Sequence, residues 1–329
     1  AFWITAGVFD VSFGGKTEVP SVGILMMENL GAEEDEFWAS GITEDLIVKV
    51  AGAGLIRVAP MKEILEVDIK ESFKEIAKEL RVKYILTSSI YKKEDGFDLH
   101  CQLIEAESGN SKYANKWSES IDKAPTIVGN LADNILKSLK VSTKQKITKV
   151  PTNNPEAYEF YLKGKYKYQI RKNKEDTDVT RGLLQKAIEF DDNIIIAKNL
   201  LALSYTEIAD YDMALKIYKL NVKQAEKNDD KISMAKSLNG IGIVKYYQGE
   251  YDKALDYYTQ SYEINEQRGD NKGMGSTLSN IGMIYKNRSE YDKALDYYTQ
   301  SIKIFEKLGE KLGMARTFGN MGNIYKKLG

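Results

Sequence analysis

Hydrophobic positions change their spacing about halfway along the chain. In the first 140 residues, short apolar runs of strand length alternate with amphipathic segments of helical spacing. The runs of strand length lie at 21–27, 55–59, 83–92, 97–106 and about 111–118. Beyond residue 154 only helical spacing remains. The pattern predicts an N-terminal mixed-sheet α/β domain over 20–140, a polar linker over 141–153 and an all-α region over 154–329.

Three helices are expected between and after these strands. Apolar residues at helical spacing predict the first over 37–51. The second is expected over 68–81, because Asp68 and Glu71 have the spacing of a capping box. The third is expected over 125–139 and closes the domain. The predicted order is β, α, β, α, β, β, β, α, which one sheet with helices packed on it accommodates.

The one histidine, His100, stands next to the one cysteine, Cys101. Neighbouring side chains on a strand point to opposite faces of the sheet, so these two cannot form a dyad of nucleophile and base. Cys101 shares a face with Leu99 and Leu103 and is expected in the core. His100 is expected on the surface.

A fixed period of forty residues governs the second half of the chain. The segment YDKALDYYTQS occurs at 251–261 and again, unchanged, at 291–301. This repetition predicts a solenoid of paired helices. The expected units are a divergent one at 154–192, then 193–232, 233–272, 273–312 and a half unit at 313–329. A lengthened turn is expected at 171–176, inside the divergent unit.

Small residues recur once per unit in each of the two helices. They are Ala202, Gly242, Gly282 and Gly322 in the first helix, and Ala214, Ala254 and Ala294 in the second. Tyrosines follow the second set at 218, 258 and 298. Small side chains let backbones approach, and aromatic rings fill the space between neighbouring hairpins. These positions are therefore expected to be structural.

The arrangement of small and aromatic residues resembles tetratricopeptide repeats, in the forty-residue form found in bacterial signalling regulators and kinesin light chains. The resemblance covers about 154–329 and implies a superhelix that holds a protein or peptide on a concave wall formed by the first helices. The wall residues that it implies are Asn199, Leu203, Lys236, Asn239, Tyr246, Ser279, Met283, Lys286, Arg316, Asn323 and Lys326. Asn side chains can hold a peptide backbone and Lys or Arg can meet carboxylates, so an acidic or C-terminal peptide is expected. The carboxylate clamp of chaperone-binding repeats is not expected, because Gly240 occupies one of its polar positions.

The N-terminal region resembles a TolB-like domain, a class related to the flagellar-assembly outer-membrane proteins. The segments that carry this resemblance, in order, are SVGILMMENL, FWASGITEDLI, LIRVA, FKEIAKELRVKYILTSSI and CQLIEAESG. Met26 and Met27 depart from the family pattern, which usually has a proline before an aromatic residue in this strand. The resemblance covers about 20–140, and such domains have no established active site to carry over.

Composition excludes several classes of function. Lys and Arg number 47 against 48 Asp and Glu, so no net positive charge favours nucleic acid or an anionic membrane surface. A single cysteine excludes an internal disulfide and multi-cysteine metal sites. No pair of carboxylates suited to two-metal cyclase chemistry can be assigned. We therefore expect no catalytic residue, no cofactor and no metal in this chain.

The first nine residues, AFWITAGVF, are almost wholly apolar but too few to cross a bilayer, which takes about 20. They are expected to be the trailing end of a transmembrane helix, with a linker up to residue 19; packing on the domain is the alternative. A TolB-like domain before tetratricopeptide repeats resembles the C-terminal region of bacterial membrane-anchored signalling proteins, whose output module is often a nucleotide cyclase, a kinase or a DNA binder. The resemblance implies a non-catalytic sensory or scaffold region, and among the output modules it favours a nucleotide cyclase. It also implies that the region is extracytoplasmic, with a cytoplasmic location left open.

Two other functions stay open at this point. One is a structural cell-envelope assembly factor without an output module, and the other is a small-ligand pocket in the N-terminal domain. The last unit, 313–329, has only its first helix, and an open solenoid end exposes an apolar face. We therefore expect self-association through that end as a further mode of binding, and continuation of the natural protein beyond residue 329.

Overall fold

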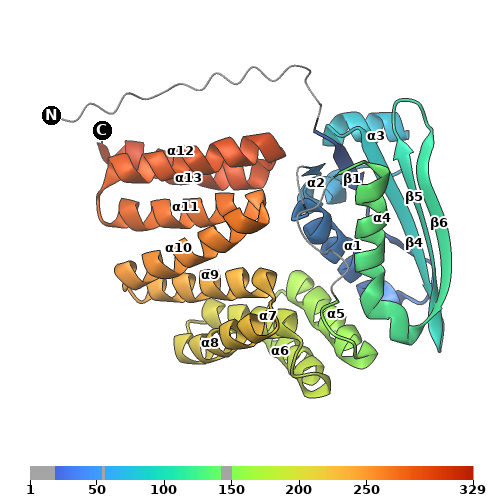
Figure 1. Cartoon of the computed structure of the whole chain (residues 1–329), viewed down its shortest axis with the longest axis horizontal. Helices are drawn as coiled ribbons and strands as arrows, with labels where there is room; N and C mark the ends of the chain where they lie inside the picture. The colour runs from blue at the N-terminus through green and yellow to red at the C-terminus, as the bar shows by residue number, and fades with distance from the viewer. Residues whose placement is uncertain (1–18, 54–55, 142–149, 329) are drawn as a thin grey trace.

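The computed structural model describes residues 19–53, 56–141 and 150–328. A mixed-sheet domain is followed by helices packed as successive pairs in a curved array (Figure 1). The expected fold class, a mixed-sheet α/β domain before an all-α repeat region, is confirmed. The apolar start at 1–9 lies outside the described residues. Within the described ranges, no helix combines the length and the apolar character needed to cross a membrane.

The N-terminal domain is built on one mixed sheet. Its strands are β1 (Ser21–Ile24), β2 (Glu28–Asn29), β3 (Arg57–Val58), β4 (Tyr84–Lys92), β5 (Gly96–Glu105) and β6 (Ser111–Ser120). They lie in the order β3-β1-β4-β5-β6, with β2 also paired to β4. Strands β3, β1 and β4 run parallel, whereas β4, β5 and β6 form an antiparallel meander.

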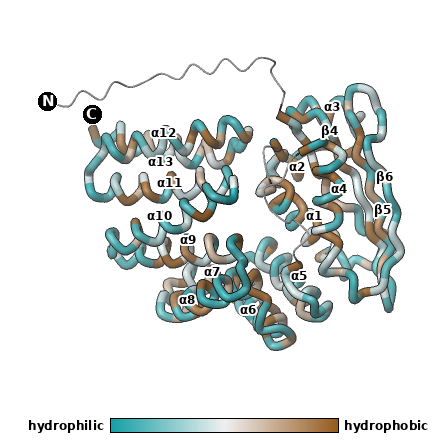
Figure 2. The backbone as a smooth tube through the Cα atoms, viewed as in Figure 1, coloured by the Kyte–Doolittle hydropathy of each residue, from teal (hydrophilic) through white to brown (hydrophobic). Residues whose placement is uncertain are grey.

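The helices of this domain pack against the sheet, and most of them lie on the side that faces the repeats (Figure 1). They are α1 (Glu36–Ala51), α2 (Met61–Glu66), α3 (Phe73–Leu80) and α4 (Ile127–Ser138), with short 3₁₀ segments η1 (Glu33–Asp35) and η2 (Ile121–Thr126). Residues of β5 alternate accordingly, since Leu99 and Cys101 are buried while His100 and Gln102 are exposed. The predictions for the histidine and the cysteine are thus confirmed. Figure 2 shows β6, the outer strand of the meander, as mostly hydrophilic.

The helix expected over 68–81 was wrong at its start. The chain forms α2 earlier, and Asp68 instead closes a turn by accepting a hydrogen bond from the backbone N–H of Lys70 at 2.9 Å. Helix α3 begins after Ser72, whose hydroxyl accepts from Glu75 N–H at 3.3 Å while the Glu75 carboxylate accepts from Ser72 N–H at 3.1 Å. This reciprocal pair is the capping box that the structure uses.

Nine described helices make up the repeat region. They are α5 (Pro155–Ile170), α6 (Lys174–Phe190), α7 (Ile195–Glu207), α8 (Tyr211–Lys227), α9 (Lys231–Tyr247), α10 (Tyr251–Arg268), α11 (Asn271–Asn287), α12 (Tyr291–Leu308) and α13 (Lys311–Leu328). The long turn expected at 171–176 was wrong, because Asn173 caps α6 by accepting from Asp176 N–H at 2.8 Å. The divergent unit therefore has the same short turn as the others.

Close contacts between helices explain the small residues of the repeat. A Cβ on Gly242 would lie 2.5 Å from the ring of Tyr258, and one on Gly282 would lie 2.6 Å from the ring of Tyr298. Both rings are fully buried. The alanines of the set, Ala202, Ala214, Ala254 and Ala294, are fully buried as well. Gly322 differs, because no described atom lies within 4 Å of the position that its Cβ would take.

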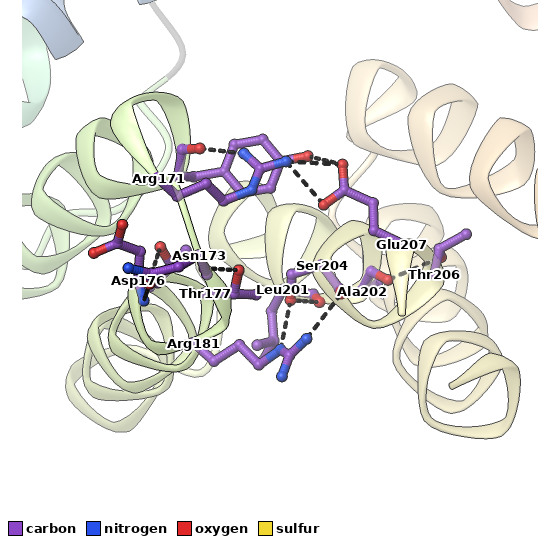
Figure 3. A network of polar contacts seen from close by, with 12 residues as sticks. Arg171, Asn173, Asp176, Thr177, Arg181, Leu201, Ala202, Ser204, Thr206 and Glu207 are labelled. Carbon is purple, nitrogen blue, oxygen red and sulfur yellow. Dashed lines mark hydrogen bonds and ion pairs between the residues drawn. The ribbon is translucent and has the colours of Figure 1, made fainter. Parts of the chain in front are cut away.

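A polar network ties the divergent first unit to the second (Figure 3). Arg171, in the turn before α6, donates two hydrogen bonds of 3.0 Å to the carboxylate of Glu207 at the end of α7. Arg181 of α6 donates from Nε to Ser204 Oγ at 3.2 Å and from Nη2 to the Ser204 carbonyl at 3.0 Å. These planar, charged donors fix α6 against α7.

The hydrophobic core does not divide at the expected linker. Buried residues of the sheet domain form one cluster with Tyr158 and Leu162 of α5, and the cluster extends to Leu201 of α7. Trp38 of α1 meets the ring of Tyr158 edge-on, with 6.1 Å between ring centres. The first unit of the repeat region thus packs as part of the N-terminal domain.

Candidate functional site

The expected wall residues lie on the first helices of successive units. Asn199 and Leu203 are on α7; Lys236, Asn239 and Tyr246 on α9; Ser279, Met283 and Lys286 on α11; and Arg316, Asn323 and Lys326 on α13. Since the units repeat at a constant interval, the set follows the array from one unit to the next.

These residues differ in how far a ligand can reach them. The side chains of Lys236, Arg316, Asn323 and Lys326 are exposed, and those of Asn239, Tyr246 and Lys286 are partly exposed. Ser279 is buried and its hydroxyl accepts from Thr317 Oγ1 at 3.3 Å. The α9 to α13 part of the wall therefore offers its cations and amides to solvent while Ser279 joins α11 to α13.

Amide side chains connect neighbouring units along the wall. Asn280 donates from Nδ2 to Asn239 Oδ1 at 3.1 Å, across the gap between α11 and α9. Asn199 accepts from Asn221 at 2.9 Å and from Ser237 at 2.7 Å, so its carbonyl oxygen is used within the array. Asn199 therefore hydrogen-bonds between neighbouring helices of the array, whereas the hydrogen bond of Asn239 uses its carbonyl oxygen and not its NH₂ group.

The wall carries cations that form no salt bridge within the described part of the chain. Among the described residues, no carboxylate pairs with Lys236, Lys286 or Arg316. The acidic residues that precede the first helices are already engaged. Asp230 caps α9 through Ser233 N–H at 3.1 Å, and Asp270 caps α11 through Gly273 N–H at 2.9 Å. Unpaired cations beside committed carboxylates favour an anionic ligand.

Lys236 lies beside the N-terminal domain. Its ammonium group interacts electrostatically with Asp45 of α1 and with Asp270, and desolvation by the surrounding protein nevertheless lowers its pKa. Lys49 of α1 also has a lowered pKa, chiefly through burial, with a smaller contribution from Lys236 itself. Two ammonium groups therefore face the same region, one from each domain, and the charge of Lys236 disfavours the charged form of Lys49.

Sequence reasoning placed no residue of the N-terminal domain near the wall. The approach of Lys49 and Asp45 depends on the curvature of the whole array, and no local pattern in the sequence carries that information. The absence of a polar clamp residue at Gly240 has a steric reason, because a Cβ there would overlap the ring of Tyr218. A larger side chain at 240 would displace α8 from α9.

A second concave feature lies in the N-terminal domain. A cavity of about 190 Å³ opens between β5, β6 and α4, with Phe97, Leu99 and Trp117 on its apolar side and Lys123 and Asn130 on its polar side. The small-ligand pocket considered above stays a prediction. Among the described residues, no group of three or more His, Cys, Asp or Glu side chains is arranged to hold a metal ion.

Comparison with known proteins identifies the class of the repeat region. The family model of the tetratricopeptide repeat matches residues 193–267 and 273–329. The chain therefore carries tetratricopeptide repeats over these residues. The divergent unit expected at 154–192 lies outside the match and stays a prediction. Repeats of this class serve as binding modules, because the stacked helices form an extended concave surface.

One curated relative is a protein of Rhizobium meliloti (strain 1021) named "Putative adenylate cyclase 3". It is 21% identical over 184 residues, which cover 54% of this chain and 31% of the relative. The chain thus matches about a third of that protein's length.

Solved structures with partial similarity to this chain include two from bacteria. Aspartyl phosphate phosphatase F from Bacillus subtilis gives a TM-score of 0.46 at 17% identity, covering 58% of this chain and 48% of that one. TolB from Acinetobacter baumannii gives a TM-score of 0.30 at 14% identity, covering 37% of this chain and 28% of that one. Neither score bears on function, and the TolB-like class of the N-terminal domain stays a prediction.

Proposed function

We propose that this chain is a non-catalytic binding region that holds an acidic segment of a partner protein, or its C-terminal peptide, on the wall formed by α9, α11 and α13. The observation that carries the proposal is that successive first helices present Lys236, Lys286 and Arg316, none of which forms a salt bridge among the described residues. Each of the three first helices carries one of these cations, so an extended anionic chain that follows the wall meets one cation per unit. Asn239 can add hydrogen bonds to the ligand backbone.

The proposal includes the setting of the chain. The similarity to a protein named as an adenylate cyclase, which the chain matches over about a third of its length, supports a region attached to a signalling module. We place that module before the apolar start at 1–9, with the start as the end of a membrane anchor and the described domains outside the cytoplasm. The coding sequence upstream of Ala1 tests this. A cyclase, kinase or DNA-binding domain there supports it, and a cleavable signal peptide contradicts it in favour of an envelope assembly factor.

Binding on the wall is tested with a fluorescein-labelled peptide of alternating Glu and Ser with a free C-terminal carboxylate. Fluorescence anisotropy with the full chain is compared with that of the Lys236→Glu, Asn239→Ala variant. The matched control is Lys219→Glu, which makes the same charge change at an exposed position on the second helix α8. We expect the wall variant to lose at least about tenfold in affinity, the equivalent of about 1.4 kcal/mol, and the control to bind normally. Equal loss in both variants, or none in the wall variant, contradicts the proposed site.

A further inference from the structure

The N-terminal domain is joined to the repeat region at two places that lie far apart in the sequence. The first is between α1 and α5. Lys165 pairs with Glu44 at 3.0 Å and with Asp45, and the Tyr161 hydroxyl lies 3.3 Å from the Asp45 carboxylate. The side chain of Lys165 is only 13% exposed, and the apolar cluster around Trp38 continues beside it. This joint is part of the core.

The second joint is between the N-terminal domain and the last two helices. Lys311, the first residue of α13, places its ammonium group 3.0 Å from Glu63 of α2. Next to this pair, the turn from α12 to α13 reaches Arg57 of β3 so closely that a Cβ on Gly309 would overlap the guanidinium. Arg57 is itself held by the carbonyl groups of Leu80, at 3.0 Å, and Arg81. We call the contacts of Arg57 and Glu63 with Gly309 and Lys311 the C-terminal latch.

Between the two joints, the N-terminal domain follows the turns that separate the units. Lys49 is within electrostatic reach of Asp230, in the turn before α9. A Cβ on Gly52 would lie 4.0 Å from Asp270, in the turn before α11. Arg57 meets Gly309, in the turn before α13. Successive residues of the N-terminal domain thus approach successive units of the repeat region. One edge of the array therefore lies along the N-terminal domain (Figure 1).

The two joints differ in strength. The α1–α5 joint buries aromatic and aliphatic side chains and cannot open without exposing the core. The C-terminal latch is ionic, and the Lys311 side chain is 45% exposed. Apart from the Lys311 ammonium, the described residues give the Glu63 carboxylate no hydrogen-bond donor. The latch is therefore the joint that opens first, and salt weakens it.

We propose that the N-terminal domain braces the tetratricopeptide array, and that closure of the C-terminal latch sets the spacing between Lys236 and Arg316 on the wall. The inference rests on the proposed binding function and adds its regulation. In an array of this kind each unit contacts only its neighbours, so small rotations add up along the units. A brace fixed at both ends removes that freedom. In the latched form Lys236 is exposed to a ligand. We expect the peptide to bind the latched form more tightly, so that opening the latch weakens peptide binding.

The latch is tested first without any ligand. Spin labels are attached at Leu65→Cys on α2 and Lys303→Cys on α12, both exposed positions, and the distance between them is measured by double electron–electron resonance. Gly309→Ala is expected to abolish the short-distance peak, because the added methyl group overlaps Arg57. The matched control is Gly249→Ala. Gly249 also has a positive φ, +76° against +65° for Gly309, but it has no described atom within 4 Å of its Cβ position. The control carries the same backbone strain and should keep the short-distance peak.

Lys311→Glu provides a second route to an open latch, because it places two carboxylates together without changing the turn. We expect it to broaden the distance distribution toward longer values, as Gly309→Ala does. A short, narrow distribution in both variants overturns the brace. The brace is also overturned if Gly249→Ala loses the short-distance peak to the same extent as Gly309→Ala.

Coupling to the wall is tested with the fluorescein-labelled Glu/Ser peptide. Opening the latch is expected to weaken peptide binding by roughly tenfold in Gly309→Ala and Lys311→Glu, but not in Gly249→Ala. If the wild-type chain binds the peptide and the open variants bind it equally well, the coupling is refuted while the proposed function stands. If the wild-type chain does not bind, the proposed function fails, and the distance measurement alone decides the brace.

Discussion

Glycines at one repeat position should respond in opposite directions to the same substitution. In Gly282→Ala the new Cβ would lie 2.6 Å from a ring carbon of Tyr298, a fully buried side chain. Moving that ring in a core packed at native density costs about 1–3 kcal/mol, against a gain of about 1 kcal/mol in helix propensity. In Gly322→Ala no described atom opposes the methyl group, so only the gain remains.

The expected result is a net loss of about 1 kcal/mol in the free energy of unfolding for Gly282→Ala and a gain of up to about 1 kcal/mol for Gly322→Ala. Urea titrations followed by circular dichroism measure both. Gly182→Ala in α6 is a control for propensity alone, because Gly182 has no described atom within 4 Å either. The reasoning is refuted if Gly282→Ala and Gly322→Ala shift the urea midpoint equally in the same direction.

Three further outcomes follow from single side chains. Tyr258→Phe should raise the free energy of unfolding by roughly 1 kcal/mol, because it removes a buried hydroxyl that has no partner among the described residues; an unchanged or lower urea midpoint would argue against this. Lys165→Met should lower the free energy of unfolding by up to about 3 kcal/mol, since the partly buried carboxylates of Glu44 and Asp45 would lie together without a cation, and Lys165→Arg should recover most of the loss in the same titration. The pKa of Lys236 is lowered by desolvation, and its charged form binds the anionic peptide. Anisotropy should therefore show that peptide affinity falls as the pH rises, and that the fall occurs at a lower pH than the titration of an ordinary lysine would give. Lys236→Arg should remove this fall.

The repeat helices could be predicted closely because each helix is specified by residues within its own repeat unit. The forty-residue period fixes where Gly242 and Gly282 recur, and packing against Tyr258 and Tyr298 gives that recurrence its physical reason. Burial of Cys101 followed from strand alternation in the same way, and burial raises the pKa of its thiol to about 11.

Errors arose where two local patterns competed. Asp68 with Glu71 and Ser72 with Glu75 both have the spacing of a capping box, and the sequence does not decide between them. The structure uses the second, because Asp68 closes a turn after α2. The position of the N-terminal domain along the turns could not be predicted. The contact of Glu63 with Lys311 results from the accumulated rotation of every unit between them.

The continuity of the core from α1 into α7 decides where the polypeptide can be divided. A fragment that begins at Pro155 would leave the ring of Tyr158 without Trp38 and would expose the apolar side of α5. A fragment that ends before Pro155 would carry the complementary exposed face and tend to aggregate. An expressible N-terminal half has to include the chain through Glu207, so the folding unit is longer than the sheet domain that the sequence outlines.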